Sequence, residues 1–147
     1  MAPGFRARAF GASRNDETGA MHYIIPMTGN ATTIPPTVRL QREPFDASAE
    51  AAKLTRGRTD VGAVVTFTGI CRGAEGDEPI AALTLEHYPD MAEAEIARHV
   101  EEARTRWPLL GVTVIHRFGR ITPGEDIVLV VTTSSRREAA FAAAEFL

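Results

Sequence analysis

Two adjacent arginines follow a predicted strand near the end of the chain. In the stretch "TTSSRREAAFAAAEFL", Ser135 and Glu138 have capping-box spacing, which predicts Ser135 as the N-cap of a helix. Arg136 and Arg137 then lie in the first helical turn, where the helix dipole disfavours cations. Free N–H groups and two guanidinium groups at such a place suit an anion. The alternative is a pair of solvated arginines on an exposed turn.

A second candidate site is the stretch "TFTGICRG", which contains Phe67 and Arg72. Strict alternation along a strand would direct these two side chains to opposite faces. Gly69 lies between them, and a glycine inside a strand often marks a bulge or a close backbone approach. A half-buried strand that ends in an arginine is the simpler interpretation of the same residues.

The other potential nucleophiles and metal ligands have weaker patterns. Cys71, the single cysteine, has no predicted helix N-terminus or fixed histidine beside it, so a small buried thiol is expected rather than a nucleophile. His22, His87, His99 and His116 lack metal-ligand spacing, although His87 and His116 end predicted strands and could line a pocket. No phosphate-binding glycine loop, catalytic triad or dinucleotide fingerprint is present, and no cofactor is expected.

Length and composition indicate one globular domain. The chain has 147 residues, of which 44% are hydrophobic and 24% charged. The net charge of −3 gives no general attraction to nucleic acid or acidic membranes. No apolar run approaches the roughly 20 residues that span a membrane, and no secretory signal is recognisable. With one cysteine and no disulfide framework, a reducing cytoplasm is the expected compartment.

The elements that position these residues begin after a leader. Residues 1–36 are predicted to be a poorly ordered leader, with Met21 as a possible alternative start, and residues 37–147 form the domain. The predicted order is β-α-β-β-α-β-β-α, and hairpin signals favour an α+β fold with helices packed on a mostly antiparallel sheet. Strands are expected at 37–43, 60–72, 80–88, 111–119 and 126–134, and helices at 44–57, 90–107 and from 135 onward.

Local signals support these boundaries. Asp46 is the predicted N-cap of the first helix and Gly57 its stop. The helix over 90–107 has one apolar stripe that ends at Trp107. Residues 122–125, with Pro and then Gly at the centre, predict a type II turn between the last two strands.

Several stretches together resemble the large, catalytic subunit of molybdopterin synthase. They are "GAVVTFTGICR", "LTLEHYPDMAEAEIARHVEEARTRWP" and "VTVIHRFGRITPGEDIVLVVTTSSRREAAFAAAEF", and the likeness covers residues 37–147 in order and spacing. The resemblance implies an α+β fold with a hammerhead-like subdomain. It also implies a transferase of molybdenum cofactor biosynthesis, which adds two sulfurs to a cyclic pyranopterin monophosphate and forms the dithiolene of molybdopterin.

The same resemblance implies protein partners. Sulfur would arrive as a thiocarboxylate on the C-terminal Gly-Gly tail of a ubiquitin-like small subunit. The working assembly would be a heterotetramer built around a homodimer of the large subunit. The apolar segments 82–88 and 126–134 favour such a homodimer, because exposed apolar strand edges are unfavourable in water. Which subunit supplies each wall of the pocket is left open.

Four residues match the family's substrate-binding positions. Phe67 and Arg72 match a pocket phenylalanine and a pocket arginine, and Arg137 matches an arginine at the helix start. Arg136 stands where a histidine is common, so it could bind an anion but could not act as an acid or base near neutral pH. If Phe67 and Arg72 share a pocket, the strand needs a bulge at Gly69 or just after it.

No catalytic residue is assigned. The family's two catalytic lysines would lie beyond Leu147, and the only lysine here is Lys53 in the first predicted helix. Because "AAFAAAEFL" has no helix-stopping residue, we expect the C-terminal segment of the domain to be missing. Two alternatives stay open: a non-catalytic module of the same fold that binds an anion or the partner's tail, and a regulatory domain for a small phosphorylated ligand.

Overall fold

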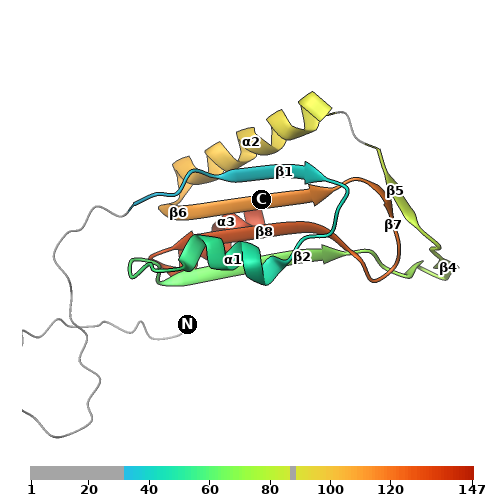
Figure 1. Cartoon of the computed structure of the whole chain (residues 1–147), viewed down its shortest axis with the longest axis horizontal. Coiled ribbons are helices and arrows are strands. Elements are labelled where there is room, and N and C mark those ends of the chain that lie inside the picture. Colours follow the sequence, from blue (N-terminus) through green and yellow to red (C-terminus); the bar gives the residue numbers. More distant parts are fainter. Residues whose placement is uncertain (1–31, 87–88) are drawn as a thin grey trace, which may run out of the picture. The chain divides into compact units, whose positions relative to one another are not determined.

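The computed structural model describes residues 32–86 and 89–147 (Figure 1). In this part of the chain, four strands form a sheet in the order β1 (Thr37–Gln41), β6 (Leu109–Arg117), β8 (Asp126–Ser134) and β2 (Ala63–Ile70). The β1–β6 pair is parallel, whereas the β6–β8 and β2–β8 pairs are antiparallel. The predicted α+β class with a mostly antiparallel sheet is confirmed.

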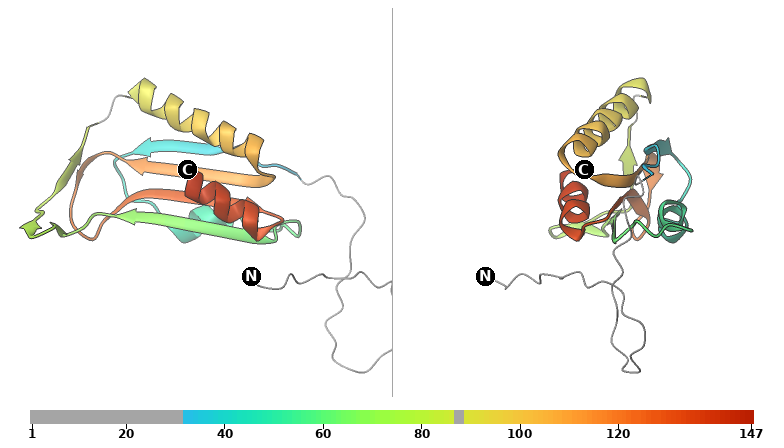
Figure 2. Two further views of the ribbon diagram at one scale, coloured as in Figure 1. Left: turned by 180° about the vertical axis from the view of Figure 1, so that it is seen from behind. Right: turned by 90° about the vertical axis from the view of Figure 1, so that its left-hand side faces the viewer.

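Helices cover both faces of this sheet (Figure 2). Helix α1 (Ala47–Thr55) packs on one face, and α2 (Pro89–Arg106) and α3 (Arg137–Phe146) pack on the other. The α1 side encloses a core of Leu54, Ile115, Leu129 and Val131. The core on the opposite side joins Val100 and Ala103 of α2 and Ala143 of α3 to Val112, Val114 and Val130 of the sheet. Because β6 and β8 are buried on both faces, their sequences are almost continuously apolar.

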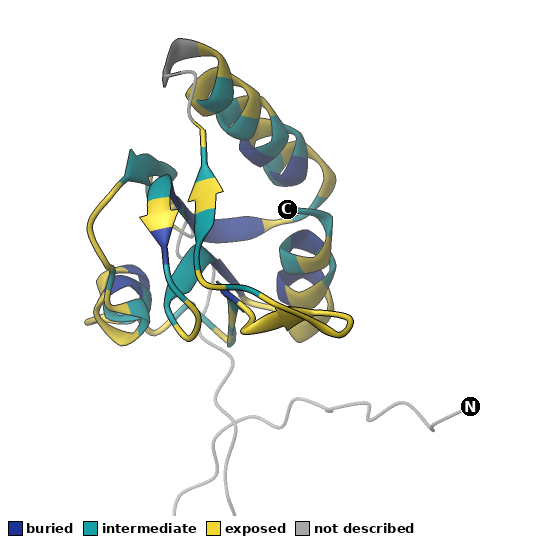
Figure 3. Ribbon diagram, turned by 90° about the vertical axis from the view of Figure 1, so that its right-hand side faces the viewer, coloured by how far each residue is buried: buried dark blue, intermediate teal, exposed yellow. Residues whose placement is uncertain are grey.

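Four short strands form a smaller part at one end of the main sheet (Figures 1 and 3). Strands β3 (Ala74–Glu75) and β4 (Glu78–Pro79) make a largely exposed hairpin. Strands β5 (Leu83–Leu85) and β7 (Gly119–Ile121) make a separate antiparallel pair. The smaller part therefore lies beside the end of β2 that follows Gly69.

The predicted long strand over 80–88 is wrong. Within its described residues, 80–86, only β5 is a strand, and Ile80 instead donates its N–H to the carbonyl of Gly73 (2.9 Å), which closes the loop around the β3–β4 hairpin. His87 and Tyr88 lie outside the described residues. The argument for a homodimer from segment 126–134 is not supported, since both edges of β8 are already paired within the chain, with β6 on one side and β2 on the other. The exposed edge next to it belongs to β2.

Most local predictions are confirmed. The carboxylate of Asp46 accepts a hydrogen bond from the N–H of Ala49 (2.9 Å), and α1 ends before Gly57, which has a φ of +71°. The N–H of Glu125 donates to the carbonyl of Thr122 (3.1 Å) and Gly124 has a φ of +88°, as a type II turn requires. The apolar stripe of α2 is buried at its centre, with Val100 fully enclosed.

The predicted leader is described only in its last residues. Residues 1–31 lie outside the described part, whereas 32–36 are joined to the domain by hydrogen bonds. Ile34 donates its N–H to the carbonyl of Leu110 (2.9 Å), and the Arg58 guanidinium donates to the carbonyl of Thr32 (2.5 Å). None of the helices within 32–86 and 89–147 has the length and apolar character needed to cross a membrane.

Candidate functional site

The junction between β8 and α3 differs from its prediction by one residue. Arg136, not Ser135, is the N-cap, and it has extended backbone angles and no side-chain capping bond. Ser134 replaces the predicted cap in part, because its hydroxyl accepts from the N–H of Arg136 (3.2 Å) and donates to the carbonyl of Pro108 (2.8 Å). This inward contact holds Ser134 in the sheet, so the helix begins at Arg137.

The junction exposes two cations and three backbone donors. Arg136 and Arg137 are both exposed, and neither forms an ion pair with any described residue. The N–H groups of Arg137, Glu138 and Ala139 likewise have no acceptor among the described residues. The partial positive charge of the helix N-terminus adds to the two guanidinium groups. The arrangement is compatible with an anion site, and anion binding by Arg136 and Arg137 stays a prediction.

A glycine before β2 supports this junction. Gly62 donates its N–H to the carbonyl of Ser134 (3.0 Å). A Cβ atom at Gly62 would lie 2.3 Å from the carbonyl oxygen of Ser135, which is closer than real Cβ atoms approach. Only glycine therefore lets the two backbones meet here.

The predicted bulge in β2 is confirmed. The register against β8 shifts between Gly69 and Ile70. Phe67 lies opposite Val130, which belongs to the core on the α2 and α3 side, so its ring is on that face of the sheet. Phe67 is 52% exposed and can contact a ligand. The predicted small thiol is also confirmed, since Cys71 is buried at 4% exposure.

Arg72 lies beyond the bulge, just before the β3–β4 hairpin. Its side chain is 72% exposed and forms an ion pair with Glu75, which is 68% exposed. The guanidinium group is thus accessible to a ligand that can replace the Glu75 carboxylate. Exposed pairs of this kind contribute little, about 0–1 kcal/mol.

The structure does not bring the four predicted residues together within one chain. Ala63 pairs with Ser134 at one end of the β2–β8 ladder, and Ile70 pairs with Asp126 at the other. At roughly 3.3 Å per residue these ends are about 23 Å apart. Arg136 and Arg137 follow the first end, Arg72 follows the second, and Phe67 lies between them.

Arg117 and Glu125 were not identified from the sequence, and their contacts lie at the end of the β2–β8 ladder that Arg72 follows. Arg117, in β6, is 6% exposed and donates to the Arg42 carbonyl (3.0 Å), the Asp126 carbonyl (2.8 Å) and the Glu125 carboxylate (3.4 Å). The N–H of Thr122, and after it the Thr122 hydroxyl and Arg117, hold the pKa of Glu125 below its usual range. The sequence did contain a pattern that could have identified this pair: an arginine inside an otherwise apolar strand, followed by a glutamate in a turn.

The remaining candidates do not form a site. His116 is hydrogen-bonded through Nδ1 to the carbonyl of Arg117 (2.8 Å), and His22 and His87 lie outside the described residues. The described residues contain no group of three or more His, Cys, Asp or Glu side chains that could hold a metal ion. Lys53 is on α1, where its ammonium group donates to Glu50 (2.9 Å), so it lies on the opposite face of the sheet from Phe67.

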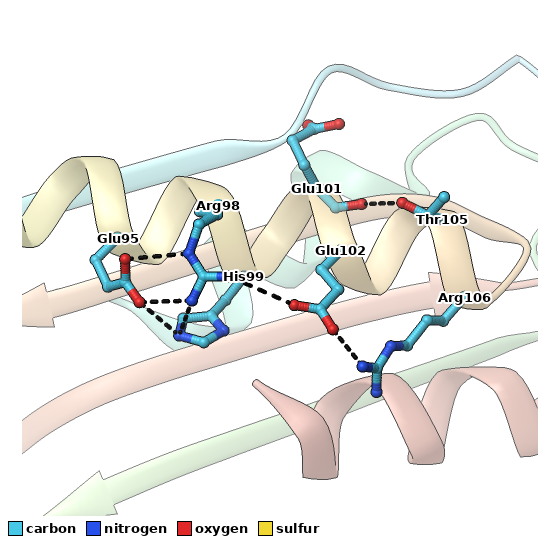
Figure 4. Close-up of polar contacts among 7 residues, drawn as sticks. All are labelled: Glu95, Arg98, His99, Glu101, Glu102, Thr105 and Arg106. Carbon is cyan, nitrogen blue, oxygen red and sulfur yellow. Dashed lines mark hydrogen bonds and ion pairs between the residues drawn. The ribbon is translucent and has the colours of Figure 1, made fainter.

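The largest group of charged side chains lies along α2 (Figure 4). Its ion pairs join residues three or four positions apart, such as Glu95 with Arg98 and Glu102 with Arg106. His99 takes part through Glu95 (3.2 Å). Arg98 is shared between Glu95 and Glu102. These are the ordinary contacts of an exposed helix face.

Comparison with known proteins gives one consistent result. The family described as MoaE protein matches residues 40–147. The molybdopterin synthase catalytic subunit of Mesorhizobium japonicum is 61% identical over 117 residues, which are 80% of this chain and 72% of that protein. The catalytic subunit of Escherichia coli is 50% identical over 105 residues, 71% of this chain and 69% of that protein.

Solved structures agree with the sequence relatives. The molybdopterin biosynthesis MoaE protein of Burkholderia ambifaria aligns with a TM-score of 0.69 at 40% identity, covering 76% of this chain and 73% of that one. Molybdopterin synthase of Staphylococcus aureus aligns with a TM-score of 0.67 at 28% identity, covering 73% and 77%. The chain therefore belongs to the MoaE family, to which these catalytic subunits of molybdopterin synthase also belong.

Proposed function

We propose that this chain is the catalytic subunit of a molybdopterin synthase, which transfers sulfur to a cyclic pyranopterin monophosphate in molybdenum cofactor biosynthesis. Family membership over residues 40–147 carries this proposal, because that range contains Phe67, Arg72, Arg136 and Arg137. The sulfur donor is the thiocarboxylate at the Gly-Gly end of a ubiquitin-like small subunit. The proposed compartment is the cytoplasm.

The chemistry of the two arginine positions suits this reaction. The substrate carries a phosphate and the donor tail ends in an anionic thiocarboxylate, and guanidinium groups bind both kinds of anion with charge-assisted hydrogen bonds. The sulfur is imported on the small subunit, so the reaction requires no reactive thiol of this chain. The burial of Cys71 agrees with a reaction that does not use this thiol.

We place the substrate pocket across a homodimer. Within one chain, Arg72 and the Arg136–Arg137 pair follow opposite ends of the β2–β8 ladder. In the described residues the outer edge of β2 is unpaired, and its neighbourhood exposes Val64, Phe67 and Ile70. An unpaired apolar strand edge favours pairing with a second chain.

A two-fold axis near the middle of β2 would reunite the split site. Antiparallel pairing of β2 with its own copy reverses the direction of the second strand, as an isologous interface requires. The Ala63 end of one protomer then meets the Ile70 end of the other. Arg136 and Arg137 of one protomer would therefore approach Arg72 of the partner subunit. The homodimer would be the centre of a heterotetramer that also holds two small subunits.

The composite pocket can be tested by mixing inactive variants. Arg72→Ala and Arg137→Ala protomers are each expected to lose most activity. In a mixed dimer, one of the two sites combines the intact Arg72 of one protomer with the intact Arg137 of the other, and the second site lacks both arginines. Random pairing then restores about a quarter of the wild-type sites. A pocket contained in one chain predicts no recovery.

The reaction itself is tested with the full-length protein. The assay combines it with the thiocarboxylated small subunit and the pyranopterin monophosphate, and it follows dithiolene formation. Product formation is expected, whereas a non-catalytic binding module would bind the substrate and form none. Light scattering at micromolar concentration is expected to give a dimer, with an interface of about 1,200 Å² or more.

A further inference from the structure

We propose that Arg117 and Glu125 are positioning residues for substrate binding, because they hold the turn Thr122–Glu125 against the backbone that carries Arg72. The inference rests on the proposed function, since it takes Arg72 to contact the substrate. Neither Arg117 nor Glu125 is itself placed in contact with the substrate.

The first step is the buried guanidinium group of Arg117. Its Nε donates to the carbonyl of Arg42 (3.0 Å) and Nη1 donates to the carbonyl of Asp126 (2.8 Å). Nη2 faces the Glu125 carboxylate at 3.4 Å. One side chain thus joins the segment after β1, the start of β8 and the turn before it. Only an arginine has donors in the planar arrangement needed to reach three such acceptors.

The second step is the Glu125 carboxylate. Its Oε1 faces Arg117, and its Oε2 accepts from the N–H of Thr122 (2.6 Å) and from the Thr122 hydroxyl (2.8 Å). The turn is closed a second time by the bond from the Glu125 N–H to the Thr122 carbonyl (3.1 Å). The carboxylate therefore fixes both the first and the last residue of the turn.

The third step joins the turn to the candidate site. The N–H of Gly124 donates to the carbonyl of Cys71, and the N–H of Cys71 donates to the carbonyl of Glu125, both at 2.8 Å. A Cβ atom at Gly73 would be in ordinary contact with Pro123, at 3.9 Å. The turn is thus hydrogen-bonded to Cys71, directly before Arg72, and its Pro123 lies near Gly73, directly after Arg72.

The exposed Arg72 side chain depends on this backbone. Among the described residues its only ion-pair partner is Glu75, which lies three positions away and is itself exposed. Nothing buried orients the Arg72 guanidinium, so the direction in which it leaves the domain is set by Cys71 and Gly73. If the turn became more mobile, the Arg72 side chain would sample more positions, and its affinity for an anion would fall.

A double-mutant cycle tests the inference on the full-length protein. Glu125→Gln keeps the size of the side chain and removes the charge that faces Arg117. We expect the Kd for the pyranopterin monophosphate to rise about tenfold, a coupling in the range seen for contacting residues. The same substitution in the Arg72→Ala background should leave Kd unchanged. Amide exchange at Cys71 should accelerate, while kcat at saturating substrate stays near that of the wild type.

Two variants act as controls. Glu101→Gln makes the same chemical change in the Glu101–Arg104 pair on α2 and should leave Kd unchanged. Thr122→Val removes only the hydroxyl bond to Glu125 and should raise Kd in the same direction by a smaller factor, which keeps the test usable if Glu125→Gln folds poorly.

Three results would overturn the inference. A Kd that rises equally in both backgrounds would show that Glu125 does not act through Arg72. An unchanged Kd for Glu125→Gln, beside a weakened Arg72→Ala, would refute the positioning role and leave the proposed function intact. An unchanged Kd for Arg72→Ala would remove Arg72 from the proposed site, and the positioning role with it.

Discussion

The two ends of the β2–β8 ladder present arginines by different means. At one end, called the junction end (Gly62 and Ser134–Arg137), the support is backbone against backbone, and the arginines themselves have no ion-pair partner among the described residues. At the other, called the turn end (Cys71–Gly73 and Thr122–Glu125), a buried arginine and a glutamate hold the turn against the backbone segment that carries Arg72.

This difference separates two kinds of sensitivity. The junction end depends on the absence of a side chain at Gly62, so it should fail by steric displacement. The turn end depends on the buried guanidinium group of Arg117 and on the half-buried carboxylate of Glu125, so it should fail when one partner loses its charge. For a substitution at either end, we can therefore predict how much it should change the stability of the protein and how much it should change the affinity for the substrate.

The largest effect is expected from Arg117→Met at the turn end. The change removes the donor from three acceptors around a buried side chain. The free energy of unfolding should therefore fall by about 3 kcal/mol or more. Urea unfolding measures the loss. Arg98→Met, in an exposed pair on α2, should change stability by less than about 0.5 kcal/mol. Equal, small effects for both variants would contradict the structural role of Arg117.

Arg137→Ala at the junction end should act on affinity instead. Loss of one charge-assisted hydrogen bond should weaken substrate binding by about 1.5–3 kcal/mol, with little change in stability. Titration calorimetry gives the affinity and thermal unfolding gives the stability. Arg56→Ala removes an equally exposed arginine after α1 and should leave the affinity unchanged. If the two variants bind equally well, Arg137 is a solvated surface residue.

Gly62→Ala tests the backbone contact of the junction end. The added Cβ would lie 2.3 Å from the Ser135 carbonyl oxygen, so the backbone must move, at a cost of about 1–3 kcal/mol. The movement should also weaken binding through Arg136 and Arg137. Gly73→Ala at the turn end is the matched control for the loss of stability, since its Cβ would meet only Pro123 at 3.9 Å. Wild-type stability and affinity for Gly62→Ala would show that the junction can shift without loss.

The sequence predicts the features of these two ends that depend on neighbouring residues, and it does not predict those that depend on residues far apart in the chain. Apolar runs of strand-forming residues correctly predicted β6 and β8, the apolar stripe at helical spacing correctly predicted the buried face of α2, and Gly69 correctly predicted the bulge. The choice between Ser134 and Ser135 as the capping serine could not be predicted, because it depends on the contact of Ser134 with Pro108, 26 residues away. Local pattern gives no register for such distant pairs.

The division of the candidate site was equally beyond local pattern. All four site residues could be named from the resemblance, but their separation depends on which residue of β2 faces which residue of β8. The role of Arg117 depends on the carbonyl of Arg42, 75 residues earlier in the chain. The resemblance to a family named the four candidate site residues, whereas only the fold shows how far apart they lie and that Arg117 supports one of them.

The smallest effect is expected from Glu75→Gln at the turn end. Arg72 is paired with Glu75, and in the proposed site an anionic group of the substrate would replace that carboxylate. Because an exposed pair contributes about 0.2–1 kcal/mol, its removal should lower the substrate Kd by a factor of roughly 1.4 to 5. Glu78→Gln, in the same hairpin but without an ion pair among the described residues, corrects for the change in net charge. The junction end offers no comparable gain, since Arg136 and Arg137 have no described carboxylate partner to release. A weaker affinity for Glu75→Gln than for Glu78→Gln would mean that Glu75 holds Arg72 ready for the substrate rather than competing with it.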